Sequence, residues 1–221
     1  LIALENTLTK PQRPLVAIVG GSKVSTKIDL LNNLIHKVDT LVVGGGMANT
    51  FLLAQGFYIG ASLAEHALKD SALNILNSAE KAGCSILLPT DVVVAKELNV
   101  NVESFVVPVN ECPEDTMILD VGPQTVERIK ESLLNTETLV WNGPLGAFEI
   151  KPFDRATNDL ANFVSKLSNN NKLVSIAGGG DTLAALKNAE ASNGFSYLST
   201  AGGAFLEWME GKKLPGITAL Q

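Results

Sequence analysis

The chain has 221 residues, 46% of them hydrophobic, which suffices for one large globular domain or two small ones. Its formal net charge of −6 argues against a general polyanion binder such as a nucleic-acid-binding protein. No apolar run approaches the ~20 residues that span a membrane, so no membrane partner is expected. Cys84 and Cys112 lack metal-site spacing and are too few for a disulfide framework, so we expect them to be reduced and buried in a cytoplasmic protein.

Residues 1–14, which include Pro11 and Pro14, are predicted to be a helix end or linker that enters the domain. Residues 15–19 are apolar and rich in β-branched types, which predicts a buried strand. Two glycines and a serine follow, and apolar residues then recur about one turn apart from 24 to 35, which predicts a helix. Lys23 and Lys27 are four residues apart, so they should share one face of its first turns.

This lysine pair is the first candidate for function. Cations are usually disfavoured at a helix start, where the macrodipole is already positive. Two lysines beside free backbone N–H groups therefore indicate a receptor for a strong anion, with phosphate as the first candidate. A solvated lysine pair on an ordinary helix remains the alternative.

Strand and helix patterns alternate along the rest of the chain without a Pro/Ser-rich linker, which favours a single domain. Further strands are predicted at 40–43, 85–88, 139–141, 173–177 and 197–198, with short candidates at 105–107 and 117–119 in a mixed region. Asp91 is placed just past the 85–88 strand. Helices are predicted at 47–54, 64–82 with Gly83 as C-cap, 124–134, 153–167, 181–189 and 204–210. The alternation predicts an α/β fold: a doubly wound, mostly parallel sheet with helices on both faces, a Rossmann-like three-layer sandwich.

Glycine-bearing loops follow five of the predicted strands, those that end at residues 19, 43, 141, 177 and 198. In open α/β sheets, ligands bind outside the carboxyl ends of the strands, and glycine lets backbone N–H groups approach a phosphate closely. The five loops favour a nucleotide or a phosphorylated ligand. The alternative is that the glycines only permit tight turns. Neither the P-loop pattern nor a clean GxGxxG is present, which disfavours a P-loop ATPase or a standard dinucleotide fold.

Three polar residues lie among these loops. Asp181 could hold Mg²⁺, which proteins bind through one or two carboxylates plus phosphate oxygens and water, or it could simply cap a helix. Glu149 could accept hydrogen bonds from ribose hydroxyls, or be a surface carboxylate. Asn142 could donate to a phosphate, or serve ordinary turn chemistry. His36 and His66 have no surrounding residues that suggest a catalytic triad.

Taken together, the motifs resemble the C-terminal, nucleotide-binding half of phosphoglycerate kinase over essentially the whole chain. They occur in the family's order, as follows: GGSKVSTKI (20–28), GGGMA (44–48), LPTD (88–91), DVGP (120–123), WNGPLGAFE (141–149), GGGDT (178–182), STAGGA (199–204) and GKKLPG (211–216). The chain departs from the family pattern at Ser22, at Thr26 and at Ala201, which stands for the first of three glycines. None of these changes removes a lysine or a backbone N–H donor.

The resemblance implies a role for each matching position. Lys27 would contact the nucleotide phosphates, and Lys23 would stabilise the phosphoryl group in flight. Asp181 would hold the Mg²⁺ of ADP or ATP. The phosphates would also meet Asn142, Gly179, Gly180 and Thr182, while Glu149 would hold the ribose. The adenine would lie near Gly21, Gly45, Gly46, Leu119, Pro144 and Ala147. Gly202 and Gly203 would donate to the transferring phosphoryl group when the enzyme closes.

In this family the phosphoglycerate half-site belongs to an N-terminal domain, and Arg13, Arg128 and Arg155 are too scattered to replace it. The expected organisation is therefore a linker at 1–14 and a nucleotide-binding domain at 15–221. The full enzyme would be a cytoplasmic monomer that moves a phosphoryl group between 1,3-bisphosphoglycerate and ADP in glycolysis. This chain alone should bind Mg-nucleotide with little or no turnover, and 3-phosphoglycerate would need the missing domain. The alternative is a stand-alone nucleotide- or phosphate-binding module without catalysis.

Overall fold

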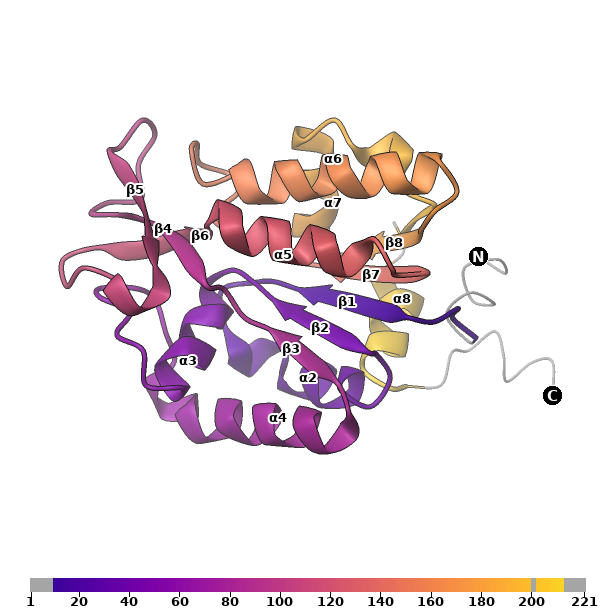
Figure 1. The fold of residues 1–221 in the computed structure, drawn as a ribbon, viewed down its shortest axis with the longest axis horizontal. Helices are drawn as coiled ribbons and strands as arrows, with labels where there is room; N and C mark the ends of the chain where they lie inside the picture. Colours follow the sequence, from indigo (N-terminus) through magenta and orange to yellow (C-terminus); the bar gives the residue numbers. More distant parts are fainter. Residues whose placement is uncertain (1–9, 200–201, 213–221) are drawn as a thin grey trace.

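The computed structural model describes residues 10–199 and 202–212. Its main sheet has six parallel strands in the order β3-β2-β1-β7-β8-β9 (Figure 1). The strands are β1 (Leu15–Val19), β2 (Thr40–Val43), β3 (Ser85–Leu87), β7 (Thr138–Asn142), β8 (Val174–Gly178) and β9 (Tyr197–Ser199). From β1 the chain first adds β2 and β3 on one side of this strand. It later returns to add β7, β8 and β9 on the other side. This reversal puts the topological switch point, where open α/β sheets bind ligands, between β1 and β7.

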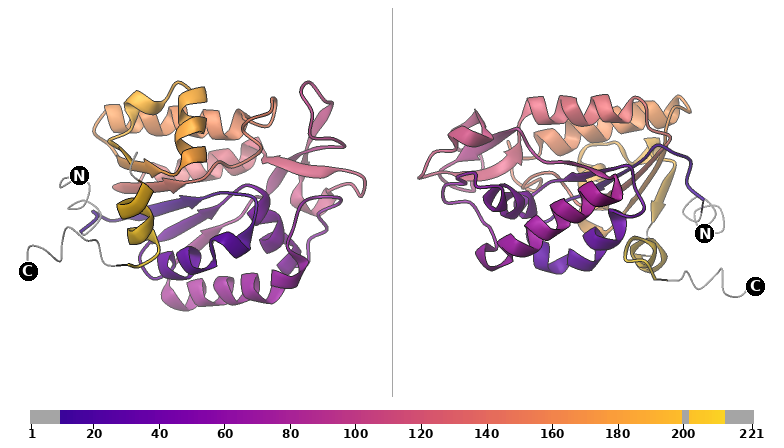
Figure 2. Two further views of the ribbon diagram at one scale, coloured as in Figure 1. Left: turned by 180° about the vertical axis from the view of Figure 1, so that it is seen from behind. Right: turned by 60° about the horizontal axis from the view of Figure 1, so that its bottom comes forward.

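Helices cover both faces of this sheet, which confirms the predicted three-layer fold (Figures 1 and 2). One face carries α2 (Ile28–Leu34), α3 (Gly46–Ala54), α4 (Lys69–Ala82) and α8 (Gly202–Met209); the other carries α5 (Pro123–Leu133), α6 (Arg155–Asn169) and α7 (Gly180–Asn188). Alternate residues of β1 enter opposite cores. Leu15, Ala17 and Val19 pack with the first group of helices, and Val16 and Ile18 with the second.

A second, smaller sheet stands at the carboxyl end of the main one and is seen at the left of Figure 1. Its antiparallel strands, in the order β5-β4-β6, are β4 (Asp91–Ala95), β5 (Ser104–Pro108) and β6 (Met117–Val121). The short strand candidates at 105–107 and 117–119 are confirmed. The strand β4 was not predicted, and Asp91 begins this strand rather than trailing the one before it. Val92 and Val94 are fully buried in a separate small core, which makes this short run a strand.

Several predicted helices begin elsewhere. The helix expected at 64–82 is a 3₁₀ turn η2 (His66–Leu68) followed by α4, which ends at Gly83 in the left-handed conformation as predicted. The helix expected from 153 begins at Arg155, after the cis Lys151–Pro152 bond, and the helix expected from 181 begins at Gly180. The remaining helical elements are the short 3₁₀ turns η1 (Val24–Thr26), η3 (Val109–Glu111) and η4 (Ser192–Gly194).

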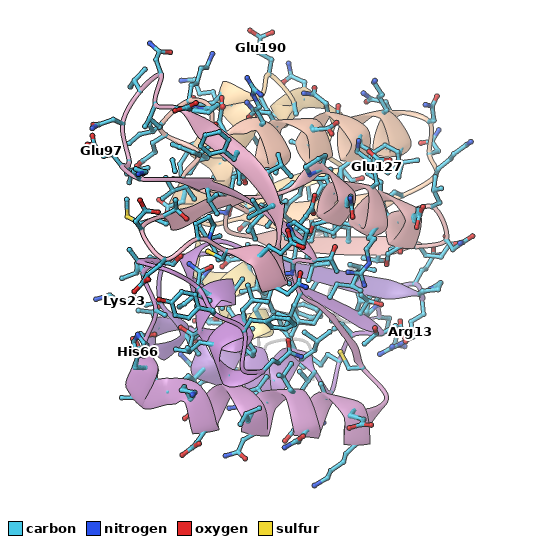
Figure 3. All side chains as sticks on the ribbon, turned by 60° about the vertical axis from the view of Figure 1, so that its left-hand side comes forward. Arg13, Lys23, His66, Glu97, Glu127 and Glu190 are labelled. Atoms are coloured by element: carbon cyan, nitrogen blue, oxygen red, sulfur yellow. The ribbon has the colours of Figure 1, made fainter. Side chains whose placement is uncertain are left out.

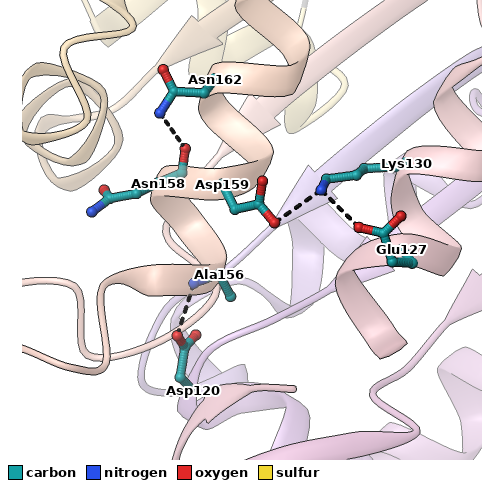
Figure 4. Close-up of polar contacts among 7 residues, drawn as sticks. All are labelled: Asp120, Glu127, Lys130, Ala156, Asn158, Asp159 and Asn162. Atoms are coloured by element: carbon teal, nitrogen blue, oxygen red, sulfur yellow. Dashed lines mark hydrogen bonds and ion pairs between the residues drawn. The ribbon is translucent and has the colours of Figure 1, made fainter. Parts of the chain in front are cut away.

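Polar contacts fasten α5 to α6 and α6 to the small sheet (Figure 4). Lys130 of α5 bridges Glu127, at 2.8 Å, and Asp159 of α6, at 2.9 Å. The Asp120 carboxylate, on β6, accepts the Ala156 N–H at 3.0 Å and thereby satisfies a free donor at the start of α6. Burial raises the pKa of Asp120 well above its usual value, although the hydrogen bonds from the Ala156 and Val121 N–H groups lower it.

Both cysteines are free and buried, as expected, and burial raises the pKa of the Cys84 thiol to about 11. In the part of the chain that the structure describes, no helix has the length and apolar character needed to cross a membrane.

Candidate functional site

A cavity of about 330 Å³ lies at the carboxyl ends of the main-sheet strands, against the small sheet. One part of its wall comes from the loops after β1, β2, β7 and β8. The rest comes from β6, from the loop between β4 and β5, and from α3 and the segment that follows it. Eight residues predicted for a nucleotide site line it: Gly21, Gly45, Gly46, Leu119, Pro144, Ala147, Glu149 and Asp181. The structure therefore brings together the segments that were expected to meet.

The loops pack tightly because glycines let their backbones touch. Gly143 has a φ of +105°, and a Cβ there would lie 2.2 Å from the Gly20 carbonyl oxygen. Gly45 has a φ of +68°, and its Cβ would lie 2.6 Å from the Gly21 carbonyl oxygen. At these two positions the glycine is needed for the fold itself, which was the alternative interpretation of the glycine-rich loops.

Gly180 differs from those glycines. A Cβ built there meets no heavy atom of the described chain within 4 Å, apart from its neighbours and its own helix. It is the first residue of α7, whose N-cap is Gly179. The N–H groups of this first turn have no partner within the helix, so α7 presents free donors and a positive dipole end at the rim of the site.

The Lys27 ammonium is held beside the cavity by oxygens of the loop after β1 and of the last residue of β7. Lys27 Nζ donates to the Gly20 carbonyl and to Asn142 Oδ1, both at 2.6 Å. A Cβ on Gly21 would lie 3.6 Å from Lys27 Nζ, so the ammonium lies directly behind this part of the wall. Burial lowers the pKa of Lys27 to about 8, and the charge of Asp181 opposes this shift.

Lys23 occupies a different environment. The chain from Val24 to Thr26 is a 3₁₀ turn, and α2 begins only at Ile28. Lys23 has extended backbone angles and its side chain is exposed, projecting outward in Figure 3. The prediction that the two lysines share one face of a helical turn is therefore wrong. Lys27 is hydrogen-bonded to Gly20 and Asn142, whereas Lys23 is exposed to solvent.

Asn142, at the end of β7, and Thr182, in the first turn of α7, are both buried and link neighbouring segments. The Asn142 amide donates to the Gly178 carbonyl at 2.9 Å while its oxygen accepts from Lys27. The Thr182 hydroxyl accepts the Gly143 N–H at 2.7 Å. These bonds fix the start of α7 relative to the loop that holds Lys27.

Asp181 lies exposed in the first turn of α7 and does not cap the helix, so the alternative that it serves only as a cap is wrong. In the described part of the chain, no three acidic, histidine or cysteine residues cluster as a metal site. A single accessible carboxylate at a helix N-terminus fits Mg²⁺ that arrives with phosphate oxygens and keeps several waters.

Eight lining residues were not predicted as site residues: Ser22, Asn49, Leu63, Leu98, Met117, Ile118, Gly146 and Phe148. Leu63 and Leu98 are large apolar side chains that stay 54% and 43% exposed, and both belong to loops. Nothing in the sequence indicated that Leu63 and Leu98, 35 residues apart, would line the same cavity.

The predicted donors Gly202 and Gly203 form the first turn of α8. Thr200 and Ala201, which precede them in the sequence, lie outside the described residues. Phe205 of α8 packs under the end of β8, where a Cβ on Gly178 would lie 2.4 Å from its ring. The helix α8 is thus seated next to the loop that leads into α7.

Comparisons with known proteins agree on one family. Residues 1–212 match the family model described as phosphoglycerate kinase. A phosphoglycerate kinase of Chelativorans sp. (strain BNC1) is 59% identical over all 221 residues, which cover 56% of that protein. A solved phosphoglycerate kinase from Coxiella burnetii superposes with a TM-score of 0.91 at 50% identity, over 99% of this chain and 55% of that one. The corresponding enzyme from Pyrococcus horikoshii OT3 gives a TM-score of 0.74 at 25% identity. The chain thus spans a little over half the length of the relatives it matches.

Proposed function

This chain belongs to the phosphoglycerate kinase family, and we propose that it is the nucleotide-binding half of such an enzyme, with Mg-ADP or Mg-ATP in the 330 Å³ cavity. The observation that carries the proposal is the division of this cavity. The small sheet and its β4–β5 loop line it with the apolar side chains of Leu98, Met117, Ile118 and Leu119, whereas α7 lines it with the Asp181 carboxylate, and the Lys27 ammonium lies behind the wall at Gly21. A nucleotide has the same polarity, with a flat base at one end and phosphates at the other.

In this arrangement the adenine lies against Leu119, Pro144 and Ala147, between the glycines of the β1 and β2 loops. Glu149, exposed on the rim of the cavity, accepts hydrogen bonds from the ribose hydroxyls. Gly179, Gly180 and Thr182 bring the phosphates to the start of α7, and Asp181 holds Mg²⁺, which supplies charge neutralisation. Phosphoryl transfer requires positioning and charge stabilisation more than covalent chemistry, so these groups suffice on the nucleotide side.

The complete reaction moves a phosphoryl group between 1,3-bisphosphoglycerate and ADP in glycolysis. We assign Lys23, Gly202 and Gly203 to the transferring group, and Asn142 and Lys27 to the phosphates that remain on the nucleotide. Residues 1–14 would join this unit, 15–221, to an N-terminal domain that binds phosphoglycerate. We further propose that the whole protein works as a monomer in the cytoplasm. In the described chain, Arg13 already pairs with Asp39 at 2.7 Å, so it offers no free guanidinium to a second substrate.

The magnesium assignment predicts how Asp181→Asn behaves. Wild-type chain should bind ADP more tightly with Mg²⁺ than without it. In Asp181→Asn we expect this advantage to fall by about tenfold, because a neutral amide is a weak Mg²⁺ ligand. ADP binding without metal should stay unchanged or tighten, since a negative charge beside the phosphates has been removed. Isothermal titration calorimetry with and without Mg²⁺ measures both quantities.

A matched control is Asp70→Asn, which changes an exposed aspartate in the first turn of α4. It should leave the magnesium advantage intact. An undiminished advantage in Asp181→Asn would contradict the assignment. A coupled assay of the chain with 3-phosphoglycerate and Mg-ATP should stay at background. Turnover typical of a complete kinase would refute the half-enzyme proposal, whereas ADP binding without turnover in any longer form would favour a binding module.

The pKa of Lys27 predicts the pH dependence of binding. In the free chain this pKa lies at about 8. Bound phosphates stabilise the ammonium and raise the pKa, so the complex holds more protons than the free chain above pH 8. ADP affinity should therefore be steady up to pH 7.5 and then fall, by at most about tenfold per pH unit. Titrations between pH 7 and 9 test this, and Lys27→Met should flatten the profile over this range.

A further inference from the structure

The 3₁₀ turn after Lys23 is capped by a carboxylate 40 residues away. Its N-cap residue, Lys23, makes no side-chain capping bond. Instead, Glu65 Oε2 accepts the Ser25 N–H at 2.9 Å, and Glu65 Oε1 accepts the Ser25 hydroxyl at 2.5 Å. One side chain therefore accepts from both hydrogen-bond donors of Ser25, and a side-chain oxygen that caps free N–H groups stabilises the turn it faces.

Glu65 is itself held in place by α3, the helix whose first residue lines the cavity. The Glu65 N–H donates to the Thr50 hydroxyl at 3.0 Å, and the Asn49 amide donates to the Leu63 carbonyl at 3.1 Å. Asn49 and Leu63 also line the cavity. A continuous set of contacts thus leads from the cavity wall through residues 63–65 to the turn that carries Lys23.

The charge of Glu65 favours the same arrangement. Its pKa is lowered chiefly by the hydrogen bonds from Ser25 and, to a lesser degree, by the charge of Lys23. The carboxylate is therefore ionised at neutral pH, close enough to Lys23 to interact with its charge. Lys23 and His66, the residue after Glu65, project on the same side of the molecule in Figure 3. Glu65 does not line the cavity, so it makes no direct contact with a ligand there.

We propose that Glu65 is a positioning residue: by capping the 24–26 turn, it sets the direction from which Lys23 reaches the terminal phosphate of ATP. This inference rests on the proposed function, in which Lys23 contacts the transferring group. Without the cap, the turn next to Lys23 is no longer held to residues 63–65. ATP binding must then order the Lys23 side chain, and the lost conformational entropy lowers the affinity for ATP.

The test compares ATP with ADP, because only ATP carries the terminal phosphate. In titrations of the 221-residue chain with Mg²⁺, Lys23→Met should lower ATP affinity by about tenfold and leave ADP affinity within about twofold. Glu65→Ala should lower ATP affinity three- to fivefold, again with ADP nearly unchanged. Glu65→Gln keeps an acceptor oxygen for Ser25 while removing the charge, so it should bind ATP within about twofold of wild type. Glu80→Gln, an exposed glutamate of α4, is the control for a change in net charge.

The decisive measurement is the double variant Lys23→Met/Glu65→Ala. If Glu65 acts through Lys23, the double variant binds ATP no more weakly than Lys23→Met alone, because the two effects are not additive. Additive losses, an equal loss for ADP, or an unaffected Glu65→Ala would overturn the proposal. Failure of the proposed function looks different: wild-type chain would not bind nucleotide, or Lys23→Met would bind ATP as well as wild type.

Discussion

Replacement of Lys27 by methionine is expected to lower the affinity of the chain for Mg-ADP by about 30-fold or more. A charge-assisted hydrogen bond to phosphate in a partly buried site contributes roughly 2 kcal/mol, and 1.4 kcal/mol corresponds to a factor of ten. The ammonium is already desolvated and lies behind the Gly21 wall, so the free chain has borne most of the cost of burying it. Calorimetry or competition with a fluorescent nucleotide measures the loss.

Methionine keeps the length and apolar stem of lysine, so the loops should retain their packing. The variant nevertheless leaves Asn142 Oδ1 and the Gly20 carbonyl without their donor, and thermal unfolding should accompany the titration. Lys172→Met, at an exposed lysine just before β8, is the control and should bind normally. A folded Lys27→Met chain with near wild-type affinity would mean that Lys27 ties loops together and contacts no ligand.

Gly143→Ala is expected to destabilise the chain by about 3 kcal/mol or more, or to prevent folding. The added Cβ would lie 2.2 Å from the Gly20 carbonyl oxygen, and the residue would keep a φ of +105° that alanine rarely adopts. Backbone cannot rotate away as a long side chain can. The β1 and β7 loops would have to separate at the switch point of the sheet.

Gly180→Ala is the matched comparison, because the same methyl group meets open space there. Its free energy of unfolding should stay within about 1 kcal/mol of wild type and could rise through better helix propensity. Urea unfolding followed by circular dichroism distinguishes the two. Equal stability of both variants would show that the contact between the Gly20 and Gly143 backbones is not needed. A stable Gly180→Ala chain with weakened ADP binding would report a ligand at the start of α7.

The parts of the fold that follow from local patterns were predicted from the sequence. The five apolar residues of β1 are all fully buried, and the strands and crossovers around β1 follow from such runs and the spacing between them. The meeting of the glycine loops at one edge follows from the parallel order of their strands. The cavity at that edge, with Asp181 and Glu149 on its rim, was therefore a consequence of topology.

The features that were missed depend on contacts between distant segments. The strand β4 is a short apolar run that becomes a strand only because β5 and β6 pair with both its edges. The helix expected to carry both lysines is interrupted because Glu65 caps a separate turn at Ser25. No periodicity in residues 20–35 encodes that partner. The cavity residues Leu63 and Leu98 could not be predicted for the same reason, because nothing in the sequence indicates that their two loops lie near each other.

The cavity is lined by residues of two sheets that have separate cores. A ligand that fills it would contact both sheets at once and thereby hold them together. Leu98, Met117 and Ile118 would pack against the base, while segments of the main sheet would bind the phosphates. Opening of the β4–β5 hairpin would then require release of the base, so nucleotide at 100 times its Kd would add up to about 2.7 kcal/mol to the cost of that opening. The rate at which the nucleotide dissociates would therefore depend on how often the small sheet opens, although Lys27 and Asp181, which bind its phosphates and Mg²⁺, belong to segments of the main sheet.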